Sequence, residues 1–211
     1  MDKIICLGRN YAGHAQEMGE SPSDTPVIFL KPPSVRRQVG RSNDRIMVKY
    51  PPRGSVLHPE CEIIVWVSNG GSHLSEEQAA LRIEWVTVGL DLTLRDVQAQ
   101  LKQVRHPWTL SKVFVDSAVL GPWLSVKEFP NYLDTEFRLV EGGRIRQSAI
   151  PRDMILKPAA AVAMISRLFP LCPGDIVFTG TPAGVDSVNV GSVLTLQWGK
   201  IRYEVCWEST E

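Results

Sequence analysis

The chain has 211 residues and a mass of 23.5 kDa, which is the size of one domain. Its 23 basic residues balance its 23 acidic residues, which excludes the strongly basic surface typical of nucleic-acid-binding proteins. Hydrophobic residues make up 44% and charged residues 22%, proportions that exclude a disordered, highly charged chain. We therefore expect a folded domain with no nucleic-acid partner.

No apolar run reaches the roughly 18 residues that a transmembrane helix needs. The first residues also lack the apolar core and small-residue cleavage site of a signal peptide. The four cysteines (Cys6, Cys61, Cys172 and Cys206) are widely spaced and form no CxxC motif. We expect reduced thiols and a cytoplasmic protein with no membrane partner.

The predicted strands are short, rich in β-branched or aromatic residues, and bounded by turn-forming residues. In chain order they are Ile4–Leu7, Val27–Leu30, Arg45–Val48, Glu60–Val67, Val86–Leu92, Glu136–Val140, Arg144–Gln147, Asp175–Thr179, Val193–Trp198 and Ile201–Trp207. Two hairpins are predicted, one turning at Glu141-Gly142-Gly143 and one at Gly199-Lys200, because glycine supplies the positive φ of a tight turn.

Three helices are predicted. Ser75-Glu76-Glu77-Gln78 has the pattern of a capping box, in which the serine and glutamine side chains satisfy free N–H groups at a helix start. Thr93 is expected to cap a second helix, which has an apolar stripe of Val97, Leu101 and Val104. A third, alanine-rich helix runs from about Pro158 to Phe169.

These elements predict a strand-dominated α+β fold for a single domain over residues 1–211. Strands and helices do not alternate regularly, which argues against a Rossmann fold or a TIM barrel. The motifs GxxxxGK[ST], GxGxxG, GxSxG and HExxH are all absent from the sequence. Their absence argues against nucleotide chemistry, serine acyl-enzymes and zinc peptidases.

The segment from Leu57 to Val67 is the most informative for function. Side chains alternate along a strand, so Glu60 and Glu62 share one face of an otherwise apolar segment. Two buried carboxylates repel each other, and a hard cation such as Mg²⁺, Mn²⁺ or Ca²⁺ compensates them. Asp91, at the end of another apolar segment, is a candidate third ligand. The alternative is that both glutamates face solvent on an edge strand.

A second candidate site follows the first predicted strand. If residues 11–17 form a helical turn, His14 and Glu17 lie at positions i and i+3 and can touch. A carboxylate beside an imidazole raises its basicity, and such a pair can act as a general base on water. The alternative is a surface pair of little energetic consequence.

The sequence resembles the fumarylacetoacetate hydrolase superfamily over nearly its whole length, from Lys3 to about Trp207. The matching segments, in the family's order and approximate spacing, are Gly8-Arg9-Asn10-Tyr11 with His14 and Glu17, Phe29-Leu30-Lys31-Pro32, His58-x-Glu60-x-Glu62, Leu90 to Gln98, Pro107-Trp108 with Ser111-Lys112, Gly121-Pro122-Trp123, and Gly180 to Val185. It looks most like the short, single-domain branch, which contains acylpyruvate hydrolases, oxaloacetate decarboxylases or tautomerases, and isomerases or decarboxylases of aromatic catabolism.

The resemblance implies a mixed β-roll or sandwich, a homodimer, and one Mg²⁺ or Mn²⁺ per subunit. It implies that Glu60, Glu62 and Asp91 bind the metal, and that His14 and Glu17 activate water. Residues implied to contact a small 2-oxo or 2,4-dioxo acid substrate are Arg9, Arg95, Gln98, Lys112 and Thr181, with Lys112 also stabilising an enolate. His58 is expected to donate a hydrogen bond in support of the metal-binding strand. Departures from the family pattern are Pro59, Trp66, Asp186, Arg36 and Arg37.

The substrates of this family share a carboxylate next to a ketone, which can chelate one metal ion and favour an enolate. The same enolate follows from hydrolysis of a C–C bond, from loss of CO₂, or from keto–enol tautomerisation and isomerisation. Retention of both His14 and Glu17 favours hydrolysis of acylpyruvates such as acetylpyruvate or fumarylpyruvate. Decarboxylation, tautomerisation or isomerisation remains an alternative. So do a non-catalytic metal-binding relative and a β-rich interaction module without a site.

Overall fold

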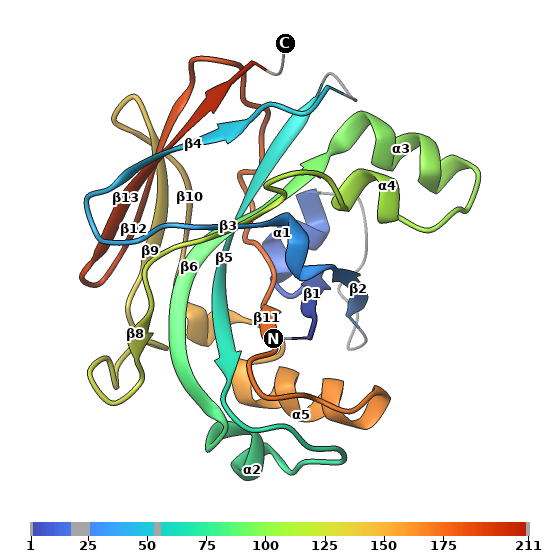
Figure 1. Ribbon diagram of the computed structural model, residues 1–211, viewed down its shortest axis with the longest axis vertical. Coiled ribbons are helices and arrows are strands. Elements are labelled where there is room, and N and C mark those ends of the chain that lie inside the picture. The colour runs from blue at the N-terminus through green and yellow to red at the C-terminus, as the bar shows by residue number, and fades with distance from the viewer. Residues whose placement is uncertain (1, 18–25, 53–55, 210–211) are drawn as a thin grey trace.

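The computed structural model describes residues 2–17, 26–52 and 56–209. Its larger sheet follows the order β2-β1-β11-β5-β6-β7-β3, with β8 paired beside β6 (Figure 1). The strands are β1 Ile4–Gly8, β2 Val27–Lys31, β3 Arg36–Gln38, β5 Leu57–Val67, β6 Ile83–Leu94, β7 Ala118–Leu120, β8 Leu124–Ser125 and β11 Ile176–Phe178. β5 and β6, the long central pair, are antiparallel.

The smaller sheet follows the order β10-β9-β12-β13-β4. Its strands are β4 Arg45–Lys49, β9 Phe137–Glu141, β10 Arg144–Ala149, β12 Val193–Trp198 and β13 Ile201–Glu208. The α-helices are short and border the larger sheet (Figure 1): α1 Ala12–Glu17, α2 Glu76–Ala80, α3 Arg95–Gln103, α4 Thr109–Lys112 and α5 Pro158–Leu168. Two 3-10 turns, Pro33–Val35 and Pro151–Asp153, complete the described elements. No helix in the described ranges is long and apolar enough to cross a membrane.

Two apolar layers follow from the alternation of side chains along the strands. Cys61, Ile63 and Val65 of β5 belong to the main core, together with side chains of β12 and β13 from the smaller sheet. Ile64 belongs to a second cluster on the opposite face of the larger sheet, with β1, β7 and β11. The predicted alternation of side chains along β5 is thereby confirmed, and Glu60 and Glu62 lie on the face opposite the main core.

The predicted fold class is confirmed. The Ser75 capping box is present, with the Gln78 N–H donating to Ser75 Oγ at 3.2 Å and the Ser75 N–H donating to Gln78 Oε1 at 3.0 Å. Both predicted hairpins form, and Gly142, Gly143 and Gly199 have φ values of 54°, 82° and 54°. All four cysteines are free, three buried and Cys172 half-buried.

The predicted cap at Thr93 is wrong. β6 continues to Leu94, which pairs with Leu57 of β5, and α3 begins at Arg95 without a side-chain cap. Long-range strand pairing overrides the local capping preference here, because Leu92 and Leu94 bury their side chains as part of the strand. β5 also begins three residues earlier than predicted, at Leu57, and it includes Pro59.

Candidate metal centre and active site

Pairing of β5 with β6 brings three carboxylates together. Glu60 lies directly opposite Asp91 in the antiparallel register, and Glu62 is two residues further along the same face of β5. One carboxylate oxygen from each residue lies within 4.8 Å of the others. Exposed fractions are 6% for Glu60 and 1% for both Glu62 and Asp91, so the alternative of a solvent-facing edge strand is wrong.

Three cationic side chains surround two of these carboxylates. Lys112 Nζ, from α4, lies 2.8 Å from Glu60 Oε2 and 2.6 Å from Asp91 Oδ2. Lys31 Nζ lies 2.5 Å from Asp91 Oδ1, and Arg95 Nη2 lies 2.9 Å from Glu60 Oε1. The carboxylates are therefore fixed in place by charge-assisted hydrogen bonds. No role was predicted for Lys31 from the sequence, although it belongs to the Phe29-Leu30-Lys31-Pro32 motif.

Glu62 has a different environment. Its Oε2 accepts the backbone N–H of Gly180 at 2.6 Å, and no ion pair reaches it from the described residues. Burial raises the pKa of Glu62 well above its ordinary value, and the negative charges of Asp91 and Glu60 raise it further. A buried group of three carboxylates, one without an ion pair, fits a hard divalent cation, so these residues could hold Mg²⁺ or Mn²⁺.

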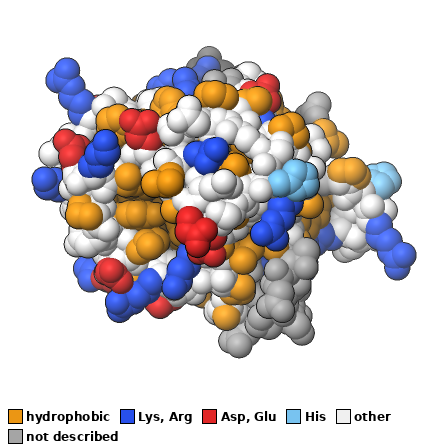
Figure 2. Space-filling view, turned by 90° about the horizontal axis from the view of Figure 1, so that it is seen from below, with side chains coloured by type: hydrophobic (Ala, Val, Ile, Leu, Met, Phe, Trp, Pro, Cys, Tyr) orange, Lys and Arg blue, Asp and Glu red, His pale blue; other side chains and the backbone are white. Residues whose placement is uncertain are grey.

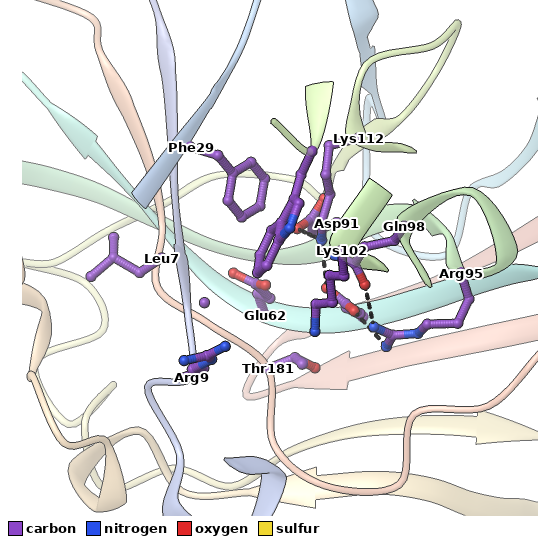
Figure 3. A pocket seen from close by; sticks show the side chains of 13 residues that line it. Leu7, Arg9, Phe29, Glu62, Asp91, Arg95, Gln98, Lys102, Lys112 and Thr181 are labelled. Carbon is purple, nitrogen blue, oxygen red and sulfur yellow. Dashed lines mark hydrogen bonds and ion pairs between the residues drawn. The ribbon is translucent and has the colours of Figure 1, made fainter. Parts of the chain in front are cut away.

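The carboxylates line a cavity of about 40 Å³. Every residue predicted to bind metal or substrate contributes to its wall (Figure 3): Glu60, Glu62, Asp91, Arg9, Arg95, Gln98, Lys112 and Thr181. The wall also contains residues for which no role was predicted from the sequence, among them Phe29, Lys102 and Trp108. The Phe29 ring lies beneath the Lys112 ammonium, with 4.7 Å between Nζ and the ring centroid, so aromatic and charged groups meet in the cavity.

Helix α3 presents one face to the cavity, because Arg95, Gln98 and Lys102 are spaced i, i+3 and i+7. Arg95 donates to Glu60, to Gln98 Oε1 at 2.7 Å and to His58 Nδ1 at 3.2 Å. In this contact His58 accepts a hydrogen bond and does not donate one to the metal-binding strand as expected. Burial lowers the pKa of His58, and the positive charge of Arg95 lowers it further, which favours the neutral ring that can accept this bond.

Arg9 reaches the cavity from a strained turn after β1. Its φ of 68° lies in the left-handed region, which a non-glycine residue adopts at a cost of about 1–2 kcal/mol. Asn10 fixes the turn, because its Nδ2 donates to Leu156 O at 2.8 Å and Thr179 O at 2.7 Å, and its Oδ1 accepts from the Leu156 N–H at 2.7 Å. Strain that the surrounding structure maintains in this way is typical of a functional position.

Thr181 borders the cavity with its hydroxyl already engaged. The hydroxyl donates to Cys61 O at 2.9 Å and accepts from Gln147 Nε2 at 2.9 Å. A substrate carboxylate needs hydrogen-bond donors, and the hydroxyl proton of Thr181 is already donated to Cys61 O. Thr181 could therefore bind such a carboxylate through its backbone N–H. Gln147, which the sequence did not single out, also accepts from the Cys61 N–H at 2.9 Å and so ties the smaller sheet to the metal-binding strand.

The structure describes only half of the predicted water-activating pair. Glu17 is exposed at the end of α1, where both of its carboxylate oxygens lie 3.2 Å from the backbone N–H of Gly184. It borders a separate hollow of about 370 Å³ and not the cavity of the carboxylates. The side chain of His14 lies outside the described part of the chain. Contact between His14 and Glu17 therefore remains a prediction.

Comparison with known proteins decides the family. The model of the fumarylacetoacetate (FAA) hydrolase C-terminal domain matches residues 3–205. The chain belongs to this family. It is 34% identical to the oxaloacetate tautomerase YcgM of Escherichia coli over 197 residues, which cover 93% of this chain and 88% of that relative.

Solved structures of the fumarylacetoacetate hydrolase family have the same fold. One is a fumarylpyruvate hydrolase from Pseudomonas aeruginosa in complex with Mn²⁺ and pyruvate, with a TM-score of 0.93, 32% identity, and coverage of 99% of this chain and 91% of that chain. Another is a 5-carboxymethyl-2-hydroxymuconate delta-isomerase from Mycobacterium smegmatis, with a TM-score of 0.82, 28% identity, and coverage of 100% and 80%. Family members similar to this chain thus carry hydrolase, tautomerase and isomerase names.

Proposed function

We propose that this protein is a divalent-metal-dependent hydrolase of acylpyruvates, which are 2-oxo acids with a second carbonyl group two carbons from the ketone. The observation that carries the proposal is the buried cluster of Glu60, Glu62 and Asp91 beside Lys112 in one cavity. A divalent cation bound there would polarise the ketone and carboxylate oxygens of such a substrate and lower the energy of an enolate.

Lys112 supports this chemistry as a permanent cation. Burial lowers the pKa of Lys112, but the charges of Asp91 and Glu60 and its hydrogen bonds to them outweigh burial, so the net pKa lies above its ordinary value. The side chain therefore donates hydrogen bonds and does not act as a base. One well-placed donor to a developing oxyanion contributes roughly 3–4 kcal/mol to catalysis.

Hydrolysis also needs an activated water, and we assign this task to His14 and Glu17. A water that loses its proton to His14 would attack the carbonyl carbon remote from the carboxylate. A methylene group separates this carbonyl carbon from the ketone. The bond between the carbonyl carbon and the methylene group then breaks, and its electron pair forms the enolate of pyruvate. The enolate takes up the proton that His14 removed from the water. A carboxylic acid and pyruvate leave. Glu17 is bonded to Gly184, three residues after Thr181 in the cavity wall, so the end of α1 is tied to the segment that continues from that wall, although Glu17 itself borders a separate hollow.

Keto–enol tautomerisation of an oxaloacetate-type acid is the second candidate. Tautomerisation needs a stabilised enolate and a proton transfer but no attacking water. A metal ion held by the carboxylate cluster, together with Lys112, would stabilise this enolate. The similarity to an E. coli protein named oxaloacetate tautomerase favours this candidate.

Parallel assays of the wild-type protein and two variants separate the candidates. With Mg²⁺ or Mn²⁺, we expect fumarylpyruvate cleavage by the wild type, loss of cleavage with EDTA, and recovery when metal is restored. His14→Ala and Glu17→Gln should lower cleavage about 100-fold or more, because general-base catalysis contributes about that factor, and should leave metal affinity nearly unchanged. Glu77→Gln, on the exposed face of α2, is the control variant.

Other outcomes count against the proposal. Unaltered fumarylpyruvate cleavage in both variants would remove His14 and Glu17 from the mechanism. Tautomerisation of oxaloacetate without acylpyruvate cleavage would select the second candidate. Turnover of neither compound, with metal bound, would indicate a non-catalytic family member.

A further inference from the structure

The guanidinium group of Arg95 is held by acceptors in three different directions. Its Nε–H donates to His58 Nδ1 at 3.2 Å, its Nη1 to Gln98 Oε1 at 2.7 Å, and its Nη2 to Glu60 Oε1 at 2.9 Å. Arginine has five N–H donors, so two of them remain for a ligand. Arg95 lines the cavity of the carboxylates (Figure 3). The three bonds therefore fix the plane of the guanidinium group and the direction of its two remaining donors.

The pairing of β5 with β6 places His58 beside Arg95. His58 lies directly opposite Thr93 in the antiparallel register, and Arg95 follows Thr93 by two residues at the start of α3. The backbone N–H of Arg95 also donates to Val56 O at 2.8 Å, which ties the start of α3 to the residue before β5. His58 and Arg95 are thus diagonal neighbours across the two strands, within reach of a direct hydrogen bond.

His58 differs from Glu60 as a partner of Arg95, because a ring nitrogen that accepts a hydrogen bond carries no proton. Glu60 supplies a negative charge, but it shares this charge with Lys112, whose Nζ lies 2.8 Å from Glu60 Oε2. Gln98, the third partner, is uncharged. Two of the three partners thus orient the guanidinium group without cancelling its positive charge, which suits a group that binds an anion.

We propose that His58 is a positioning residue for substrate binding, whose Nδ1 aligns Arg95 so that its two remaining donors meet the oxygens of a 2-oxo acid. This inference rests on the proposed function, because it takes Arg95 as a contact of the substrate. It holds for hydrolysis and for tautomerisation alike, because both begin with binding of the acid. His58 acts through Arg95, since it is not among the described residues that line the cavity.

Two variants of His58 test the role of its acceptor. His58→Leu has no acceptor, whereas the Oδ1 atom of His58→Asn can take the place of Nδ1. Calorimetry measures the binding of pyruvate to the Mn²⁺-loaded protein. We expect His58→Leu to weaken pyruvate binding about tenfold with Mn²⁺ affinity nearly unchanged, and His58→Asn to restore most of the affinity. His106→Leu, in the exposed turn between α3 and α4, is the control and should bind pyruvate like the wild type.

A double-mutant cycle tests whether His58 acts through Arg95. Arg95→Leu should weaken pyruvate binding more than His58→Leu does, and adding His58→Leu to Arg95→Leu should cause less than about a twofold further loss. Unchanged binding in His58→Leu, equal losses in His58→Leu and His58→Asn, or the same loss with and without Arg95 would overturn the inference and leave the proposed function standing. Failure of the wild type to bind pyruvate with Mn²⁺ would overturn the proposed function and this inference with it.

An NMR measurement tests the contact itself and remains decisive where pyruvate binding falls below detection. In the Mg²⁺-loaded protein without ligand, the Arg95 Nε–H is expected to give a ¹H–¹⁵N signal, because its hydrogen bond to His58 slows exchange with water. The signal should persist in His58→Asn and disappear in His58→Leu. Its persistence in His58→Leu would show that Arg95 does not depend on His58 for its position.

Discussion

Glu62 is the carboxylate whose charge the protein itself compensates least. Glu60 and Asp91 make ion pairs with lysine and arginine side chains, whereas Glu62 accepts the Gly180 N–H. The folded protein therefore binds a proton at Glu62 more tightly than the unfolded chain does. Without metal, stability therefore falls as the pH rises from the ordinary pKa of a glutamate toward the raised pKa of Glu62, because the unfolded chain loses this proton first, and a bound cation would offset the loss.

Metal binding should consequently weaken as the pH falls. At pH values below the raised pKa of Glu62, a cation must displace a proton, so the apparent affinity should fall by up to about tenfold per pH unit. The rise in Tm produced by Mn²⁺, followed from about pH 8 down to about pH 6, measures this effect. Glu62→Gln should show almost no Mn²⁺-induced rise at any pH, with a metal-free Tm at or above that of the wild type. A rise that is independent of pH in the wild type would contradict the assignment.

The β5–β6–β7 unit holds the carboxylates in register, and Gly89 permits its close packing. Gly89 lies opposite Glu62 of β5 and Leu120 of β7. A Cβ at this position would meet Val119 O at 2.1 Å and Ile64 Cδ1 at 2.5 Å. Val119 O belongs to the backbone of β7 and cannot move aside alone. The strands β6 and β7 would therefore have to move apart at a point two residues away from Asp91.

Gly89→Ala should therefore cost about 3 kcal/mol of unfolding free energy, the upper part of the range for overpacking. For a chain of this length, that corresponds to a fall in Tm of roughly 6–12 °C, together with weaker Mn²⁺ binding. Gly13→Ala in α1 is the matched control, because its nearest neighbour would be Ala183 Cβ at an ordinary 3.8 Å. Thermal unfolding of both variants checks the prediction, and equal Tm values would contradict it.

Elements with a local signal could be predicted from the sequence, and elements defined by distant pairing could not. The Ser75 capping box and the two glycine hairpins form as expected, because their determinants lie within a few residues. β3 and β7, with three residues each, and β8, with two, were missed, because such strands are too short to show a period of two. α4, which carries Lys112, was also missed, because a helix of four residues is too short to show a helical period.

Gln147 connects the smaller sheet to the cavity in the larger one. Its side chain accepts from the Cys61 N–H and donates to Thr181 Oγ1 at 2.9 Å and Pro182 O at 2.8 Å. It is 1% exposed, so water cannot readily replace these bonds. One side chain of the smaller sheet thus supports both the metal-binding strand and the Thr181 segment.

Gln147→Leu should destabilise the protein, because the buried Cys61 N–H loses its acceptor at a cost of about 1–3 kcal/mol. Displacement of Thr181 should also weaken binding of 2-oxo acids in the presence of Mn²⁺. Urea unfolding and calorimetry measure the two effects, with exposed Gln100→Leu as the control. Unchanged stability and binding would show that the two sheets support the cavity independently.

The acidic half of the site could be predicted because alternation along one strand places Glu60 and Glu62 together, and because Asp91 ends a second apolar segment. The positions of Lys31, which pairs with Asp91, and of Lys102, which lies against the Trp108 ring, could not be predicted, since these contacts depend on the order of the strands and the direction of α3. The homodimer and the role of His14 remain predictions from the family resemblance.

Anomalous diffraction from a crystal soaked in Mn²⁺ would show whether the three carboxylates hold a metal ion. We expect one strong peak in the cavity, bonded to oxygens of Glu60, Glu62 and Asp91. Absence of a peak there, with Glu60 and Asp91 still bonded to Lys112 at saturating Mn²⁺, would contradict it.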